Sequence, residues 1–338
     1  MQSADIILFF IPRCSFEPCG TIIPFPTRAS NLPASPPLLT VNSVPIDETF
    51  AEAFPMSATN LVVTAETIGW ARIAGQTATG YAASVIGCDA EAGIERELSP
   101  EETPDGRPGV SLLFFGFSRD NLQKAVVNRV AQCVLTCATT ACYNGLVGDP
   151  GKSIKVGGSL RFFGDGWQIS KLLDGKRYWR MPTMDGEFLC EDLFGTVKGV
   201  AGGNFLILGE TQSKALAAAE AAVEAIRRLP RVILPFPGGI VRSGSKVGSK
   251  YPSLKASTNE AYCPSLRGLV NSALPEGVNA VYELVIDGLD LAAVEEAMRV
   301  GIRAACRSGV LRITAGNYGG KLGPHHIHLH KLGLELTT

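Results

Sequence analysis

The stretch NFLILGETQSKALAAAEAAVEAIRRL, from Asn204 to Leu229, places a short apolar run directly before a long alanine-rich segment. The run from Asn204 to Glu210 has the length and apolar character of a buried strand. The segment from Thr211 to Leu229 consists mostly of Ala, Leu, Glu and Arg, which are strong helix formers. The stretch therefore predicts a strand followed by a helix.

The same order of elements occurs in both halves of the chain. In the first half we expect strand, helix, strand, strand and helix at 60–66, 67–81, 84–88, 110–117 and 119–137. In the second half we expect strand, helix, strand, strand, helix and strand at 204–210, 211–229, 231–236, 280–288, 291–307 and 310–314. Ser118 and Asp290 are suitable N-caps for the later helix of each half. Two split β-α-β units predict an α+β fold of two tandem ferredoxin-like lobes.

Residues 1–41 differ from the rest of the chain. They are rich in proline, and the apolar run IILFFI is too short, and lacks the preceding basic residues, for a secretory signal. We interpret residues 1–41 as a disordered extension, or as sequence upstream of the true start of translation. We place the two lobes at residues 42–185 and 186–338.

Composition excludes several classes of protein. The 338-residue chain is 46% hydrophobic and 19% charged, with a formal net charge of −1, so it lacks the basic excess of nucleic-acid binders. No apolar run approaches the roughly 18–20 residues of a membrane span. Nine cysteines at scattered spacings, without a Cys-x-x-Cys pair, indicate reduced thiols in a cytoplasmic protein and argue against a cysteine zinc site.

A long loop from Leu234 to Cys263 abandons every periodic pattern. Glycines and prolines punctuate it, so its backbone can turn sharply and approach a ligand closely. It is rich in hydroxyl groups and carries four cations before its first acid, Glu260. This combination favours binding of an anionic ligand, and a solvated surface loop is the alternative.

Two other motifs do not indicate a ligand. Residues 148–153 (GDPGKS) resemble a phosphate-binding loop, but the first glycine of that pattern would fall on Leu146. On a strand, His326, His328 and His330 would share one face, as in some metal sites. No acidic or cysteine cluster completes such a site, so we expect no metal, and a polar face of a terminal strand is the alternative.

Several longer motifs carry a resemblance to a known family. From about Val41 to the C-terminus the chain resembles the formylmethanofuran:tetrahydromethanopterin formyltransferase family. A further segment, 175–191 (GKRYWRMPTMDGEFLCE), is similar to the bacterial form, the D subunit of the formyltransferase/hydrolase complex of methylotrophs. The motifs are DETFAEAF (47–54), EAGIE (91–95), PEETPDGRPG (100–109), FFGDG (162–166), GVAGGNF (199–205) and AGNYGGKLG (315–323), with parts of the long loop at 235–250 and 256–263.

The resemblance implies an acyltransferase that moves a formyl group between N5 of tetrahydromethanopterin and the amine of methanofuran. Both carriers are co-substrates, and no cofactor is bound. The implied setting is formaldehyde oxidation to formate in a methylotroph-type pathway, or methanogenesis as an alternative. A homo-oligomer, dimer or tetramer, is implied, and so are the other subunits of a formyltransferase/hydrolase complex as partners. A non-enzymatic ferredoxin-like regulatory module is the competing hypothesis.

Glu283 is the expected proton-handling residue, from the resemblance and from its position. On the strand at 280–288, the period of two places Glu283 between Val281 and Val285 on the face opposite the helices. Burial among apolar side chains would raise its pKa and keep a proton available near neutral pH. The alternative is a structural ion pair with a neighbouring cation such as Arg312.

Transfer through a tetrahedral adduct also needs donors for the developing oxyanion. The expected candidates are Gly202, Gly203, Asn204 and Asn317, and ordinary tight turns are the alternative reading of these segments.

The resemblance further implies that methanofuran has a polycarboxylate tail. The residues expected to hold it are Arg242, Ser245, Lys246 and Lys250 of the long loop, together with Arg161. The basic segment 152–180 and the acidic segment 89–105 could instead form a contact between subunits.

Overall fold

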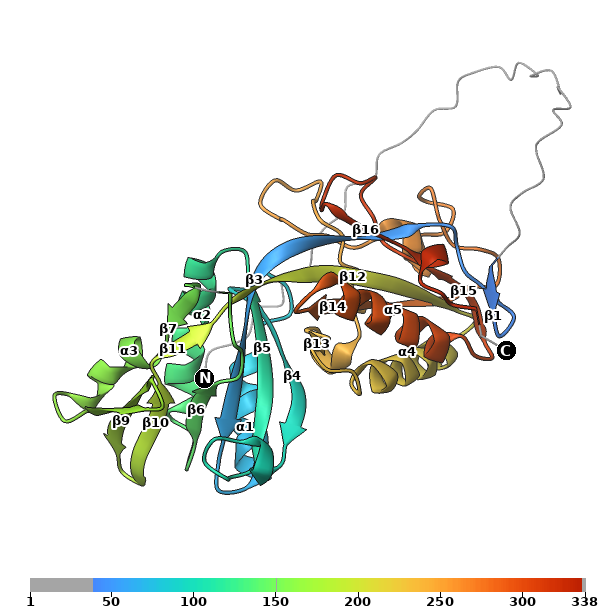
Figure 1. Cartoon of the computed structure of the whole chain (residues 1–338). Helices are drawn as coiled ribbons and strands as arrows, with labels where there is room; N and C mark the ends of the chain where they lie inside the picture. Colours follow the sequence, from blue (N-terminus) through green and yellow to red (C-terminus); the bar gives the residue numbers. More distant parts are fainter. Residues whose placement is uncertain (1–38, 150, 336–338) are drawn as a thin grey trace, which may run out of the picture. The chain divides into compact units, whose positions relative to one another are not determined.

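Two long antiparallel strands run through both halves of the protein (Figure 1). They are β3 (Phe50–Thr64) and β12 (Val197–Gly209), and they pair over residues 54–58 and 197–201. The computed structural model describes residues 39–149 and 151–335, which belong to one compact unit. Most of the extension expected at 1–41 therefore lies outside the described residues.

The N-terminal lobe is built on β3. Its antiparallel sheet has the strand order β6-β3-β5-β4. The α-helix α2 continues into one π-helical turn, η2 (Val130–Val134). The elements of the lobe in chain order are β3, α1 (Ile68–Thr79), β4 (Glu91–Leu98), β5 (Gly109–Gly116), α2 (Arg119–Arg129) and β6 (Ala141–Asn144).

The C-terminal lobe repeats this plan on β12, with the strand order β15-β12-β14-β13. Thr211 and Asp290 cap its two helices by accepting backbone N–H groups of the first turn. Its elements are β12, α4 (Gln212–Ile226), β13 (Val232–Ile233), β14 (Ala280–Gly288), α5 (Leu291–Ala305) and β15 (Val310–Thr314). The predicted α+β fold of two ferredoxin-like lobes is confirmed.

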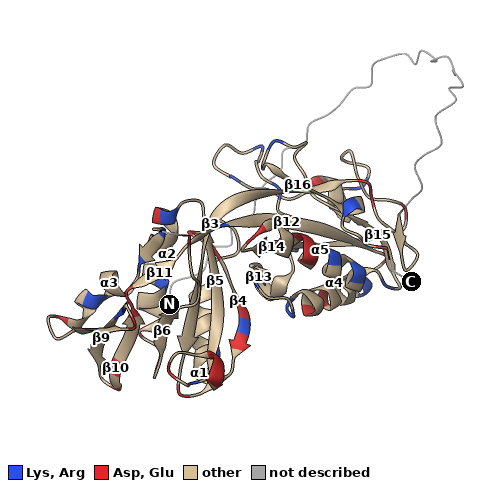
Figure 2. Ribbon diagram, in the orientation of Figure 1, with Lys and Arg blue, Asp and Glu red and all other residues tan. Residues whose placement is uncertain are grey.

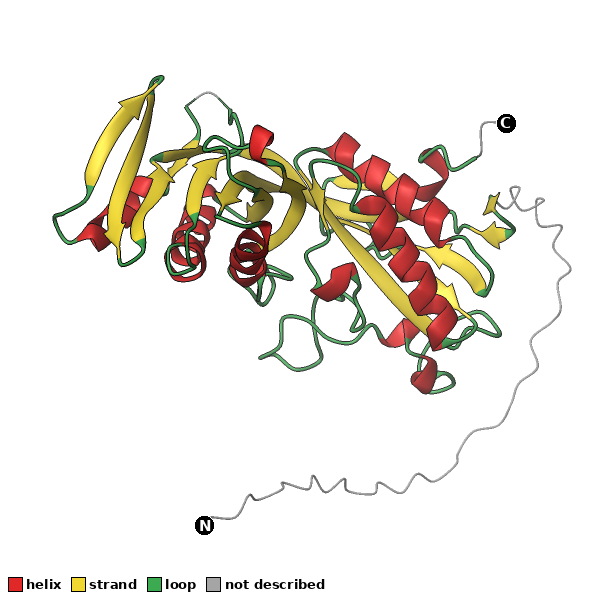
Figure 3. Ribbon diagram, turned by 90° about the horizontal axis from the view of Figure 1, so that it is seen from below, coloured by secondary structure: helices red, strands yellow, loops and turns green. Residues whose placement is uncertain are grey.

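Helices α4 and α5 lie side by side on the sheet of the C-terminal lobe (Figure 3). Leu284 and Ile286 of β14 join the buried cluster that contains α4 and α5 residues such as Ala218 and Met298. Because strand side chains alternate, Glu283 and Val285 point to the opposite face. The helix-free face of this sheet is therefore available for a site.

A smaller layer extends the N-terminal lobe. Strand β10 runs parallel to β6 and pairs antiparallel with β9, so residues beyond 185 still belong to the sheet of this lobe. The chain enters the C-terminal lobe only along β12. The remaining strands and the short helix are β1 (Thr40–Val41), β2 (Val44–Pro45), β7 (Ser153–Lys155), α3 (Gly157–Leu160), β8 (Ile169–Leu173), β9 (Lys176–Thr183), β10 (Gly186–Glu191), β11 (Leu193–Gly195) and β16 (His325–His328).

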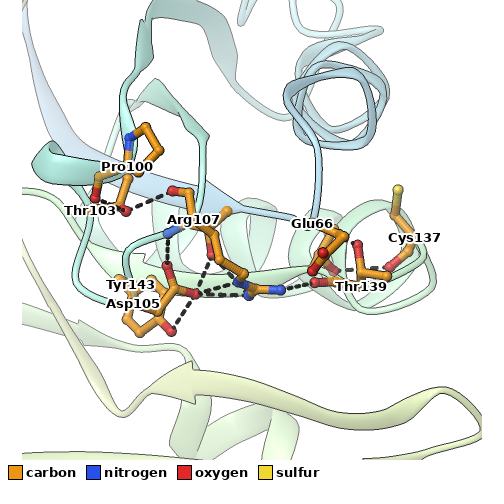
Figure 4. Close-up of polar contacts among 10 residues, drawn as sticks. Glu66, Pro100, Thr103, Asp105, Arg107, Cys137, Thr139 and Tyr143 are labelled. Carbon is orange, nitrogen blue, oxygen red and sulfur yellow. Dashed lines mark hydrogen bonds and ion pairs between the residues drawn. The ribbon is translucent and has the colours of Figure 1, made fainter.

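A polar network fixes the connection between β4 and β5 (Figure 4). Arg107 donates to Asp105 (2.9 Å), to Thr64 Oγ1 (3.1 Å) and to the Thr139 carbonyl. The Tyr143 hydroxyl donates to Asp105 over 3.0 Å. Burial would raise the pKa of Asp105, but these donors and the Arg107 charge together lower it. The motif at 100–109 thus anchors the loop to β3 and β6, which is a structural role.

The acidic segment 89–105 is largely neutralised within its own lobe. Figure 2 shows acidic and basic positions next to each other on β4. These ion pairs leave few free acids there for a contact between subunits. The pairs are Asp89 with Arg129, Glu97 with Arg72, Glu102 with Arg96, and Asp105 with Arg107.

Three elements differ from the sequence predictions. Residues 84–88 form turns, and the second strand is β4, in the segment that looked like an acidic connection. The helix expected at 119–137 is α-helical only to Arg129, whose guanidinium turns inward to carbonyls at the end of α1. The strand expected at 231–236 is reduced to β13, because Pro235 has no N–H for the ladder.

Gly301 allows the close packing of α5 in the C-terminal lobe. A Cβ at this position would lie 2.6 Å from Ile226 of α4 and 3.0 Å from the Phe205 ring. We expect Gly301→Val to lower the free energy of unfolding by about 1–3 kcal/mol, because the well-packed core must move apart. Urea denaturation at constant m-value measures this change.

Gly69→Ala is the control, because Gly69 is an exposed glycine of α1 and a Cβ there would meet only Thr67 Oγ1, at an ordinary contact distance of 3.5 Å. It should leave stability unchanged or raise it by up to about 1 kcal/mol. A Gly301→Val protein as stable as the parent would contradict the described helix packing.

Candidate active site

A pocket of about 790 Å³ opens on the helix-free face of β12 and β14, where the two lobes meet. The loops that follow β13 and β15 enclose it on the C-terminal side, and the start of β3 and residues 84–86 enclose it on the other. The lining residues used below are Glu52, Phe54, Glu91, Phe117, Gly202, Asn204, Phe236, Ser245, Lys246, Tyr262, Glu283, Asn317 and Tyr318.

Glu283 lies in this pocket and is only 3% exposed. Its backbone N–H and C=O pair with Val241, which brings the long loop alongside β14. The Ser245 hydroxyl donates to Oε1 over 2.6 Å, and Oε2 has no hydrogen-bond partner among the described residues. The alternative partner, Arg312, forms an ion pair with Asp47 over 3.4 Å. Within the described part of the chain, Glu283 is therefore buried without a cation.

Burial raises the pKa of Glu283 to about 7, although the hydrogen bonds from Ser245 act in the opposite direction. A carboxyl with this pKa is present in both protonation states near neutral pH. It can therefore donate a proton and accept one in successive steps of a single reaction. The expectation that desolvation sets its acidity agrees with this environment.

A chain of hydrogen bonds holds Ser245 in place. The Tyr318 hydroxyl donates to the Ser245 carbonyl over 2.9 Å and accepts the Val247 N–H over 2.8 Å. The loop that bears Tyr318 is anchored in turn on Glu52 of β3, which accepts the N–H groups of Tyr318 and Leu322. Burial would raise the pKa of Glu52, but these backbone donors lower it. Glu52 is thus an anionic anchor for one wall of the pocket.

Asn204 joins two other segments of the pocket. Its amide donates to the carbonyls of Gly202 and Gly316 and its oxygen accepts the Gly316 N–H over 2.7 Å. The Asn317 amide donates to Thr49 and to the Phe50 carbonyl. These groups are occupied by contacts within the chain, so their role as oxyanion donors stays a prediction that requires them to rearrange.

The structure gathers only some of the predicted site residues. Glu283, Ser245, Lys246, Gly202, Asn204 and Asn317 line the pocket. Gly203 faces the helices, since an added Cβ would collide with Val294 of α5. Arg161 lies in the layer of β8–β10, stacked on Phe162 and Trp179, and does not line the pocket. Arg242 and Lys250 are exposed on the long loop outside the lining.

Sequence reasoning did not assign roles to Glu52, Glu91 or the aromatic residues Phe54, Phe117 and Phe236. Glu52 and Glu91 stand inside the motifs 47–54 and 91–95, which is the only signal that pointed to them. Their burial depends on partners far along the chain, such as the loop at 315–323 for Glu52.

Within residues 39–149 and 151–335, no group of three or more His, Cys, Asp or Glu side chains is arranged to hold a metal ion. His326 and His328 of β16 both pack against the ring of Phe50 on β3. The His330 ring contacts the Ile46 carbonyl. Among the same described residues, no helix combines the length and apolar character needed to cross a membrane.

Two ferredoxin-like lobes enclose a pocket with a buried carboxyl whose pKa is about 7, and this arrangement suits a class of enzymes that use general acid–base catalysis. Two family profiles match most of the chain: formylmethanofuran-tetrahydromethanopterin formyltransferase over residues 39–183, and the proximal lobe of the same enzyme over residues 186–332. The chain belongs to the formylmethanofuran-tetrahydromethanopterin formyltransferase family. The predicted membership in this family, and the predicted enzyme class, are confirmed.

Individual relatives agree with this assignment. The chain is 58% identical over 296 residues to a formylmethanofuran--tetrahydromethanopterin formyltransferase of Methylococcus capsulatus, covering 86% of this chain and 99% of the relative. It is 54% identical over 303 residues to the D subunit of the formyltransferase/hydrolase complex of Methylorubrum extorquens, covering 87% and 97%. A formyltransferase of Methanosarcina mazei is 50% identical over 295 residues, covering 86% and 99%.

Solved structures show the same fold. The formyltransferase of Methanosarcina barkeri superimposes with a TM-score of 0.82 at 49% identity, over 87% of this chain and 100% of that one. A chain of the formyltransferase/hydrolase complex from Methylorubrum extorquens, solved with methylofuran, has a TM-score of 0.85 at 52% identity, over 88% and 99%.

Ser245 offers a direct test of the pocket's electrostatics. Its hydrogen bond favours the ionised form of Glu283, so Ser245→Ala should raise the pKa of Glu283 further. The limb of the pH–rate profile that reports Glu283 should therefore move to higher pH. Ser243→Ala is the control, because that hydroxyl contacts only the Gly244 carbonyl among the described residues. Identical profiles for both variants would contradict the contact.

Proposed function

We propose that this protein transfers a formyl group between the amine of methanofuran and N5 of tetrahydromethanopterin, with Glu283 as the general acid–base. The observation that carries this proposal is a buried carboxyl with a pKa of about 7, inside the pocket between the lobes and unpaired by any cation of the described residues. The two carriers are inferred from the family to which the chain belongs, and they act as co-substrates.

The chemistry requires two proton movements. The attacking nitrogen adds to the formyl carbon and must lose a proton, and the leaving nitrogen must gain one as the tetrahedral adduct breaks down. Ionised Glu283 accepts the first proton and its protonated form delivers the second. The net reaction therefore returns the carboxyl to its starting state in either direction of transfer.

Two surfaces of the pocket suit two carriers. Phe54 and Phe117, whose rings lie 6.3 Å apart, form an aromatic wall on the N-terminal lobe, where a ring system can stack. The long loop supplies cations on the other side. Lys246 forms an ion pair with Glu260, whereas Arg242, Lys250 and Lys255 form none among the described residues, so Lys250 is one of three loop cations free to attract an anionic carrier.

The relatives named above support a proposal about assembly. The D subunit of the Methylorubrum extorquens complex is a relative, and a chain of that complex superimposes on this one. We propose that this chain forms a homo-oligomer, dimer or tetramer, and associates with hydrolase subunits of the same kind. A cytoplasmic location and flux toward formate are part of the same proposal.

Glu283→Gln tests the assigned acid–base role. The amide keeps the size of the side chain and its contact with Ser245 but cannot exchange a proton. General acid–base assistance is worth roughly 10²–10⁴-fold, so kcat should fall by that factor while KM for both carriers changes little. Chromatographic measurement of formyl exchange between the two carriers gives both constants.

The same variant should be more stable at pH 8 than the parent. A raised pKa means that the folded protein holds a proton released by the unfolded chain, so the stability from this group is lost as pH rises through about 7. Removing the ionisable group should therefore raise the free energy of unfolding at pH 8 by about 1–3 kcal/mol. A variant that melts earlier and retains most of its kcat would show that Glu283 has only a structural role.

Lys250→Ala tests the carrier-attracting role of the long loop. We expect KM for formylmethanofuran to rise, and to rise more at low salt, because exposed charges attract over a distance that ions screen. Lys171→Ala is the control, since Lys171 is an exposed lysine of β8 that does not line the pocket. Equal KM values for parent and Lys250→Ala at low ionic strength would mean that the loop does not bind the carrier through this charge.

A further inference from the structure

Two carboxyl groups that the proposed chemistry does not use meet at the junction of the lobes. Glu91 belongs to β4 of the N-terminal lobe and is 5% exposed, whereas Asp287 belongs to β14 of the C-terminal lobe and is fully buried. Their side chains lie close enough to form a hydrogen bond with each other. One buried oxygen of each, Glu91 Oε2 and Asp287 Oδ2, has no hydrogen-bond partner among the described residues. Two carboxylates cannot form such a bond unless one of them carries a proton.

No cation of the described residues compensates the pair, since neither Glu91 nor Asp287 forms a salt bridge there. The arginines on the elements around them are occupied, because Arg129 binds Asp89 over 2.5 Å and Arg231 binds Asp290. On the neighbouring strands, the other acids also have partners: Glu95 of β4 accepts the Arg231 N–H, and Glu283 of β14 accepts Ser245. On β13, the residue opposite Asp287 is Ile233, whose side chain is apolar.

The pair also holds two segments of the pocket. The second oxygen of Glu91 accepts the Val85 N–H over 3.0 Å, and Val85 lies in the pocket wall of the N-terminal lobe. The second oxygen of Asp287 accepts the Gly202 N–H over 3.1 Å, at the bulge of β12 that lines the opposite wall. The pair therefore links both walls of the pocket across the lobe junction, next to the buried cluster that includes Phe115, Ala201 and Ile233.

We propose that Glu91 and Asp287 share a single proton and act as a positioning pair, which holds the two walls of the reaction pocket at their working separation. When the shared proton leaves, two carboxylates face each other in a buried site and repel, so the walls move apart. The pair positions the pocket and does not touch the reacting atoms. The kinetic part of this inference rests on the proposed function, whereas the stability part does not.

The pair should make the folded protein less stable as pH rises. Burial raises the pKa of both groups, and the charge of Glu91 adds to this effect for Asp287. The folded protein then holds a proton that the unfolded chain releases above the ordinary carboxyl range of about 4. The stability from this proton is complete below that range and is lost as pH rises through the folded pKa. Over that window the unfolding equilibrium constant shifts about tenfold per pH unit for one proton.

The test compares the full-length parent with Glu91→Gln and Asp287→Asn. In each variant the amide donates to the remaining carboxylate at every pH, and its oxygen still accepts the backbone N–H of Val85 or Gly202. In the parent, unfolding should release about one more proton than in either variant. The free energy of unfolding should therefore fall less steeply with rising pH in both variants than in the parent. At alkaline pH, KM for both carriers should rise in the parent and stay level in the variants, with kcat less affected.

Glu97→Gln is the matched control, because Glu97 lies on the same strand but is exposed and paired with Arg72. It should keep the parent's pH dependence. The proposal is overturned if Glu91→Gln and Asp287→Asn also keep the parent's pH dependence. It is overturned as well if both variants fail to fold at neutral pH, because an amide supplies the same donor and acceptor as a protonated carboxyl. Protein that shows the expected unfolding profile but transfers no formyl group would refute the proposed function and leave the pair intact.

Discussion

The pairing of β3 with β12 is the constraint on which the rest of the structure depends. Residues 54–58 and 197–201 form a short antiparallel ladder that fuses two four-stranded sheets into one. Each of these strands is also the first strand of its own lobe, so neither lobe can turn without bending a strand of the other. Close approach is possible because Gly199 lies there, where a Cβ would be 2.9 Å from both Ala58 and the Phe115 ring.

The pocket shows how partners set the ionisation of buried carboxyls. Glu52 and Glu283 are 2% and 3% exposed, but Glu52 accepts several backbone N–H groups and its pKa is lowered. Glu283 has one serine as its partner, and its pKa rises to about 7. Asp287 faces another carboxyl and its pKa is raised well above the usual value. Burial penalises the charged form of each of them. The number of neighbouring donors and the charge of the neighbouring groups then decide whether the pKa is lowered or raised.

The glycine-rich and hydroxyl-rich loops serve mainly to build these surroundings. The long loop places Ser245 on Glu283 through its bridge with Val241, and Tyr318 fixes the position of Ser245 from the opposite loop. Such a site is assembled from separate segments of the chain and held by backbone groups. Its geometry therefore depends on the junction of the lobes more than on any one motif, and a shift of the lobes would change the surroundings of Glu283.

The sequence by itself determined the repeated order of strands and helices, because hydrophobic periodicity and capping residues are local properties of the chain. It also determined which face of β14 bears Glu283, since strand side chains alternate. It could not identify β4, whose polar sequence EAGIEREL becomes a strand by pairing with β5, with Glu97 neutralised by Arg72 of α1. Only the tertiary structure decided that Glu52, Glu91 and Asp287 are buried, because their partners lie about 200–270 residues away in the chain or in the other lobe. Ionisation and burial are set by neighbours in space, and a local sequence pattern carries no information about neighbours so distant along the chain.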